Sequence, residues 1–93
     1  MIRSFRDTET ERIFHGFRSR KLPFEIQETA YRKLVLIHNA ATITDLKVPP
    51  GNQLQKLQRD REGQWGIRIN NQWRICFSWS DGDAYNVEIV DYH

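Results

Sequence analysis

The sequence closes on three residues that can titrate, stack or form hydrogen bonds: Asp91, Tyr92 and His93. Order normally fades at chain termini, yet an apolar, strand-like run leads directly into this triplet. Two arginines, Arg68 and Arg74, lie upstream in similar runs. These residue types suit RNA cleavage without a metal. That reaction needs a group to take the 2′-hydroxyl proton, cations at the phosphate and a group to protonate the leaving 5′-oxygen.

Each side chain has an expected part in that chemistry. Arginine presents a planar fork that matches phosphate oxygens, and His93 titrates near neutral pH. Tyr92 is placed either to hydrogen-bond the phosphate or to stack on a splayed base. The sequence has no Gly-rich phosphate loop, no serine-nucleophile motif and no close carboxylate pair with an evident partner. Nucleotide hydrolysis and acyl transfer are therefore poorly supported, although by spacing alone any basic sheet surface offers similar parts.

Cysteine and histidine usage argues against a metal or a cofactor. Cys76 is the single cysteine, and the three histidines stand far apart with no HExxH or similar spacing. We therefore predict no metal site and no cofactor. Length and composition predict one globular domain spanning residues 1–93, with 39% hydrophobic and 28% charged residues.

Charge and hydropathy bear on partners and location. No segment approaches the ~18 apolar residues of a membrane span, and charges interrupt the first residues, unlike a signal peptide. We therefore expect a cytoplasmic protein without a membrane partner. The formal net charge of +2 fits a nucleic-acid partner but does not require one, because counterion release depends on local clusters of Lys and Arg.

Helix signals fill the first 40 residues. The stretch "DTETERIFHG" predicts a helix with Asp7 or Thr8 as N-cap and Gly16 as its stop. A longer helix is predicted from Pro23 through "PFEIQETAYRKLVLIHNA". Its core-facing stripe recurs at helical spacing: Ile26, Ala30, Leu34 and Ile37.

The remainder predicts strands in an antiparallel sheet, with one face on the helices and the other free. Alternating apolar runs occur in "GQWGIRI", "WRICFSW" and "YNVEIVDY". A short run between Leu54 and Leu57 and another from Ile2 to Phe5 are further strand candidates.

Register links these strands to the candidate site. If odd-numbered apolar residues share the core face, each hairpin loop must hold an odd number of residues, as Asn-Asn-Gln and an Asp-Gly-Asp loop do. Trp79 then lies opposite Tyr85 and Arg74 opposite Val90, so Tyr92 is diagonal to Arg74. The even-numbered residues are predicted to face away from the core: Arg68, Arg74, Cys76, Ser78, Asn86, Glu88 and Tyr92.

The run "PPGNQLQKLQRDREGQWGIRINNQWRICFSW" followed by "GDAYNVEIVDYH" resembles HigB-type toxins of the RelE superfamily, from bacterial type II toxin–antitoxin modules. The resemblance covers essentially the whole chain. It implies an α/β (α+β) fold with two N-terminal helices packed on a twisted antiparallel sheet, like small microbial ribonucleases. It also implies cleavage of mRNA in the ribosomal A site. The implied partner is a HigA-type antitoxin with a helix-turn-helix, through which alone the pair binds its DNA operator.

The resemblance also assigns roles by position. The family's sheet arginine matches Arg74, and its terminal triplet matches Asp91, Tyr92 and His93. Gln55 and Gln58 stand where some relatives carry a histidine and a lysine, which puts the full activity of this chain in question. The candidates for the missing positive charge and for RNA binding are Lys56, Arg59, Arg61 and Arg68.

Two alternatives remain open at the level of the sequence. One is a non-enzymatic toxin on the same fold that binds gyrase, as in the ParE branch, whose members lack the terminal triplet. The other is a plain RNA-binding module, which would tolerate the loss of His93.

Overall fold

The computed structural model describes residues 1–92. Two helices come first, α1 (Thr8–Phe14) and α2 (Phe24–Asn39), and three short 3-10 turns follow at η1 (Ile43–Lys47), η2 (Pro50–Asn52) and η3 (Arg59–Arg61). The strands are β1 (Gln55–Lys56), β2 (Gln64–Arg68), β3 (Trp73–Ser80) and β4 (Asp83–Asp91). They form an antiparallel sheet in the order β1-β2-β3-β4, so the predicted fold class is confirmed.

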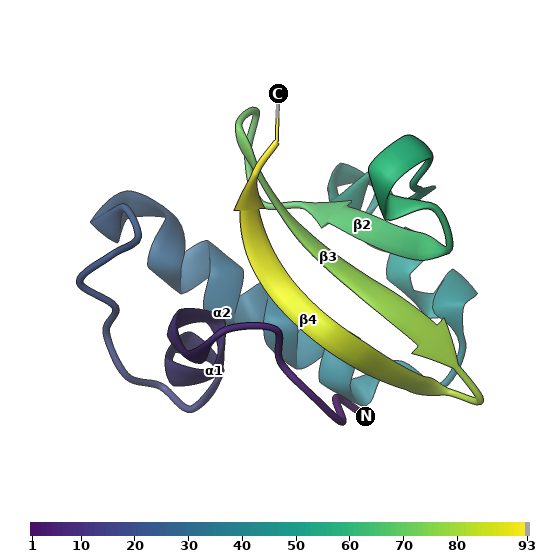
Figure 1. Ribbon diagram of the computed structural model, residues 1–93, viewed down its shortest axis with the longest axis horizontal. Helices are drawn as coiled ribbons and strands as arrows, with labels where there is room; N and C mark the ends of the chain where they lie inside the picture. Colours follow the sequence, from purple (N-terminus) through teal and green to yellow (C-terminus); the bar gives the residue numbers. More distant parts are fainter. Residues whose placement is uncertain (93) are drawn as a thin grey trace.

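Both helices form where the sequence predicts them. Asp7 is the N-cap of α1, and its Oδ1 accepts a hydrogen bond from the Thr10 N–H at 2.7 Å. In α2 the four predicted core residues are at most 2% exposed. Figure 1 shows α1 beside the long β3–β4 hairpin and α2 running behind it, with the segment from η1 to β2 on the side of the hairpin away from α1.

One continuous core joins these layers. Leu34 and Ile37 of α2 meet Ile75 and Phe77 of β3, and all four side chains are fully buried. The N-terminal segment covers the outer edge of β4 through isolated parallel bridges from Ile2 and Phe5, which is how the short strand candidate at residues 2–5 is realised. The sheet edge is thus protected from pairing with other chains.

The β2–β3 hairpin has the predicted register. The Ile69 N–H donates to the Trp73 carbonyl at 2.8 Å, so three residues, Asn-Asn-Gln, form the loop. Arg68 consequently lies opposite Arg74. The two arginines are therefore neighbours at the end of β2 and the start of β3, and the end of β4 lies at this same end of the sheet (Figure 1).

The prediction for the β3–β4 hairpin is wrong in detail. Its turn holds only Asp81 and Gly82, both at positive φ (50° and 81°), and Trp79 pairs with Ala84 rather than with Tyr85. Compared with the predicted three-residue loop, a two-residue turn moves the side chains at the start of β4 to the opposite faces of the sheet. A bulge then restores the predicted facing, because β4 has one extra residue between the partners of Ser78 and Cys76, next to Asn86 at φ 54°.

Two consequences follow for individual residues. Tyr85, predicted to face the core, is 36% exposed because it precedes the bulge. Beyond the bulge the residues of β4 pair with β3 in the predicted register, and Arg74 lies opposite Val90 as expected. Two opposite errors in the predicted register thus cancel before the candidate site is reached.

Cys76 corrects the prediction of a free outer face. It was expected to point to solvent, yet it is fully buried. Gly66 pairs with Cys76, and a Cβ placed on Gly66 would lie 3.3 Å from the Leu57 side chain, which is itself only 3% exposed. The segment around Leu57 therefore folds over Gly66 and Cys76 and covers this part of the sheet face that points away from the helices.

Thr10 links α1 to β4 and yields a stability prediction. Its side chain is fully buried, and its Oγ1 accepts a hydrogen bond from the Ile89 N–H at 3.0 Å. Thr10→Val keeps the shape but leaves this buried donor without an acceptor, which typically costs about 1–3 kcal/mol. Chemical denaturation should show that loss, and Thr10→Ser, which keeps the hydroxyl, should lose less of the hydrogen-bond energy.

Candidate active site

Arg74 and Tyr92 are the centre of the candidate site. The Arg74 guanidinium carbon lies 5.2 Å from the centre of the Tyr92 ring. Tyr92 is held there because its N–H donates to the Gln72 carbonyl at 2.7 Å, which extends the strand pairing one residue past β4. The predicted diagonal contact between Arg74 and Tyr92 is therefore present.

The Arg74 guanidinium has a buried nitrogen with no acceptor. Its Nη1 atom is shielded from solvent, and within the described part of the chain nothing accepts a hydrogen bond from it. A buried, charged donor without an acceptor is costly, and such cases call for an explanation. The 5.2 Å between the guanidinium carbon and the Tyr92 ring centre leaves no room for a phosphate between them, so an anionic ligand that supplies the acceptor would approach the guanidinium from beside the ring.

An ion pair lies on the same face beside Arg74. Arg61 donates to a Glu88 oxygen at 2.6 Å and to Gln64 at 3.2 Å, and Glu88 is only 13% exposed. Arg6 approaches the other Glu88 oxygen at 3.8 Å. The hydrogen bond to Glu88 raises the pKa of Arg61 above its ordinary value, so Arg61 keeps its charge next to Tyr92.

Glu88 had no assigned role in the sequence-based prediction. Its even number placed Glu88 on the same face as Arg68 and Arg74. Its negative charge on that positively charged face was the signal that could have identified it as a partner for an arginine. The fold gives it a positioning part: it fixes the Arg61 side chain, which comes from the separate turn η3, against the sheet.

Lys56 reaches the site from β1. A shallow hollow next to Tyr92 is lined by Gln55, Lys56, Leu57 and Gln58. The two glutamines that replace basic residues of some relatives therefore do border the site. Lys56 is the cation on this border, and its Nζ also lies 5.7 Å from the centre of the Trp65 ring.

The remaining predicted residues are placed differently. The odd number of Asp91 would turn it toward the core side in the predicted register, yet it is exposed, and its Oδ2 accepts a hydrogen bond from the Gln72 side chain at 3.0 Å. Arg68 lies beside Arg74 but hydrogen-bonds to Asn71 at the hairpin loop. His93 and the side chain of Arg59 lie outside the described parts of the structure.

Cys76 lies under the site but is not a nucleophile. Burial raises the pKa of its thiol to about 11 from an ordinary value of 9.0. At pH 8 the thiolate fraction is then about 100-fold lower than for an unperturbed thiol, and only the thiolate reacts. Iodoacetamide labelling followed by mass spectrometry should be at least that much slower in the folded protein than in urea. Equal rates would contradict the burial of Cys76.

The described residues contain neither a cluster of metal ligands nor a membrane-spanning helix. In residues 1–92, no group of three or more His, Cys, Asp and Glu side chains is arranged to hold a metal ion. Over the same residues, no helix is both long and apolar enough to cross a membrane.

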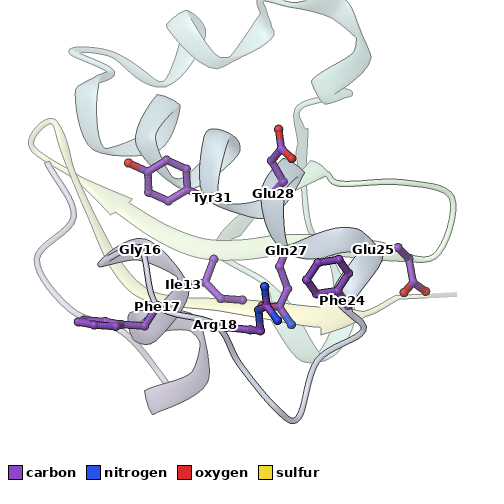
Figure 2. A pocket seen from close by; sticks show the side chains of 9 residues that line it. All are labelled: Ile13, Gly16, Phe17, Arg18, Phe24, Glu25, Gln27, Glu28 and Tyr31. Carbon is purple, nitrogen blue, oxygen red and sulfur yellow. The ribbon is translucent and has the colours of Figure 1, made fainter.

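A second hollow is lined by none of the arginines of the candidate site, Arg61, Arg68 and Arg74. It is formed by the end of α1, the following loop and the start of α2 (Figure 2). Its border includes exposed Phe17 and Phe24, and the Arg18 guanidinium lies 4.7 Å from the Phe24 ring centre. Because its lining is mainly apolar and includes two glutamates, Glu25 and Glu28, this hollow does not suit a phosphate.

Comparison with known proteins places the chain. Residues 3–93 match the family described as the RelE-like toxin of type II toxin–antitoxin system HigB. The chain belongs to the HigB-like toxin family. Its partner, as the type II class requires, is an antitoxin.

Curated relatives agree with this family. The chain is 36% identical over 87 residues to Toxin HigB-1 of Vibrio cholerae serotype O1, covering 92% of each chain. It is also 32% identical over 93 residues to Endoribonuclease HigB of Proteus vulgaris, covering 100% of both.

Solved structures confirm the RelE-type fold. YafQ from E. coli strain BL21(DE3) matches with a TM-score of 0.60 at 14% identity, covering 98% of this chain and 91% of that one. The YoeB–YefM complex from Staphylococcus aureus matches with a TM-score of 0.61 at 18% identity, covering 100% and 95%.

Proposed function

We propose that this HigB-like toxin is a metal-independent endoribonuclease that cuts mRNA in the ribosomal A site and thereby inhibits translation. The observation that carries the proposal is the buried, unpaired Nη1 of Arg74 beneath the Tyr92 ring. Phosphate oxygens are the acceptors that an arginine fork fits best. The printed name of the Proteus vulgaris relative, an endoribonuclease, supports the same activity.

The proposed reaction is an attack of the 2′-oxygen on the neighbouring phosphorus. The P–O5′ bond breaks, a base takes the 2′-hydroxyl proton and an acid gives a proton to the 5′-oxygen, which leaves a 2′,3′-cyclic phosphate and a 5′-hydroxyl. Arg74 stabilises the charge that develops on the phosphate. Tyr92 holds the guanidinium by stacking and presents its hydroxyl to the phosphate or its ring to a base.

Proton transfer in this proposal falls to the terminal residues. His93 is the group with an ordinary pKa near neutrality, and Asp91 is next to it in the sequence. Arg61 and Lys56 border the same face and steer the RNA backbone, and Arg59 is the further candidate in η3.

The ribosome completes the site in this proposal. With one terminal histidine and no evident second imidazole at the site, the chain is short of groups to orient a 2′-hydroxyl unaided, and orientation contributes strongly to rate. Purified toxin should therefore cut mRNA at least about 100-fold faster with translating ribosomes than without them. Equal rates would contradict ribosome dependence, and no cutting in either sample would contradict the endoribonuclease.

The proposed antitoxin is of the HigA type, with a helix-turn-helix through which the complex binds its DNA operator. Expression of the toxin alone should then arrest growth, and co-expression of the antitoxin should restore it. Harmless overproduction of folded toxin would count against a toxic activity of this chain.

A further inference from the structure

Arg32 and Lys33 of α2 border a hollow together with Ile69, the residue that follows Arg68 at the end of β2. The charges of Arg32 and Arg68 both act on Lys33, so these three cations form a cluster where α2 meets the end of β2. Each is tethered by a neutral oxygen. Arg32 donates to the Thr29 hydroxyl at 3.3 Å, and Arg68 donates to the Asn71 side chain. Such tethers restrict the side chains without neutralising their charge.

Lys33 is the most firmly held of the three. Its ammonium donates to the Oδ1 of Asn52, a residue with no exposed surface. The Asn52 amide nitrogen in turn donates to the carbonyls of Leu46 and Val48 at 3.1 and 3.3 Å, which fixes the direction of its oxygen. Lys33 therefore has a defined position, and it keeps two further ammonium protons for another acceptor.

Three arginines elsewhere in the described structure have carboxylate partners. Arg3 is paired with Asp83 at 3.2 Å, and Arg6 and Arg61 are both paired with Glu88. Within residues 1–92, no carboxylate forms an ion pair with Arg32, Lys33 or Arg68. The cluster is thus a pre-positioned positive charge whose counter-charge is not part of the described chain.

The cluster adjoins the candidate active site. Arg68 is the strand partner of Arg74, which places their Cα atoms about 5 Å apart. On its other side, a hollow between α2 and the end of β2 is bordered by Arg32 and Lys33 over an apolar floor that includes Leu36, Pro49 and Ile69. A charged border over an apolar floor fits a nucleotide better than it fits a small anion.

The three charges act on one another. Burial, followed by the charges of Arg32 and Arg68, lowers the pKa of Lys33 below its ordinary value. Bound phosphates would relieve this repulsion, so the cluster gains most from an anion that contacts several cations at once.

We propose that Arg32, Lys33 and Arg68 form a second binding site for an RNA phosphodiester backbone, next to the scissile phosphate at Arg74. The inference rests on the proposed function, because it extends the RNA path from the cleavage centre onto α2. The backbone belongs either to the mRNA or to ribosomal RNA lining the A site, and both offer the same phosphate chemistry.

The test uses the full chain with Arg32→Gln and Arg68→Gln combined. Lys33 is left in place because its contact with Asn52 supports the fold. The matched control is Arg20→Gln with Lys21→Gln, which removes the same charge from the loop between α1 and α2. Affinity is measured across a salt series for two probes: a single-stranded RNA with a 2′-deoxy nucleotide at the cut position, and ribosomes without mRNA.

Loss of two phosphate contacts should reduce the slope of log K against log salt by about 1.4 for single-stranded RNA. The probe whose slope falls identifies the source of the backbone. In the cleavage assay the KM of the double variant should rise about 10-fold or more, with a smaller change in kcat. Control variants should change neither slope nor KM by that amount.

Failure of this inference is distinguishable from failure of the proposed function. If wild-type toxin cuts mRNA and the double variant matches the control for both probes, the second site is wrong. If the slope falls but wild-type toxin cuts nothing, the cluster binds RNA and the proposed nuclease activity is wrong.

Discussion

Replacing Arg74 by alanine is expected to lower the rate of mRNA cleavage about 10²- to 10³-fold, the usual cost of removing one preorganised donor to developing charge. Its Nη1 has no acceptor within the described structure, so it is a donor for which a bound phosphate would supply the missing partner. Growth arrest should disappear with the cleavage. The measurement is the cleavage rate in a translation reaction, alongside thermal melting of the variant.

Folding should survive this change. A buried donor without a partner contributes little to stability, so the free energy of unfolding should stay within about 0.5 kcal/mol of the wild-type value or rise. Arg74→Lys keeps the charge but loses the planar fork and should also cut slowly. Full activity of Arg74→Ala in a folded protein would move the cleavage centre elsewhere.

Removing Tyr92 and His93 together is expected to lower cleavage by about 10²- to 10⁴-fold, the range for losing a positioned acid or base. The shortened chain should still fold, because Tyr92 is 37% exposed and lies beyond the last residue of β4. It should also still bind antitoxin and ribosomes. Cleavage and ribosome binding are measured on the same preparation.

Tyr92→Phe in the full chain separates the two effects of the tyrosine. The ring remains over Arg74 while the hydroxyl is lost, so this variant reports the hydroxyl alone. Undiminished cleavage after loss of both terminal residues would favour a catalytic centre built on Lys56, Arg59 and Arg61, whereas growth arrest without any cleavage by the full chain would favour a plain RNA-binding module.

Local signals were sufficient for the helices and for the central contact of the site. The stripe of α2 follows from helical spacing, and the three-residue loop before Trp73 sets the parity of β3. That parity predicts Arg74 on the outer face, and the predicted pairing of Arg74 with Val90 on β4 then places Tyr92 diagonal to it.

The β3–β4 hairpin shows that an odd or even loop length alone does not predict the facing of every residue in a strand. The Asp81-Gly82 pair is a strong signal for a two-residue turn, whereas the bulge beside Asn86 has no comparable signal in one sequence. Their effects on alternation cancel, so the site is correctly placed although Tyr85 is not.

Contacts between segments far apart in the chain could not be predicted from the sequence. The burial of Cys76 depends on how Leu57 folds over Gly66, and the Arg61–Glu88 pair joins residues 27 positions apart. The cluster of Arg32 and Lys33 with Arg68 depends likewise on how α2 packs against the end of β2. Such contacts are set by tertiary packing rather than by spacing.

End-group analysis of mRNA fragments tests the central claim, that the chain itself cleaves RNA through the 2′-hydroxyl. A message is translated in a cell-free system with wild-type toxin, and its new ends are mapped by primer extension and identified chemically. The account predicts 5′-hydroxyl ends within codons, and no cut where the nucleotide before the cut is 2′-deoxy. Ends carrying a 5′-phosphate, or intact mRNA while translation stops, would contradict it.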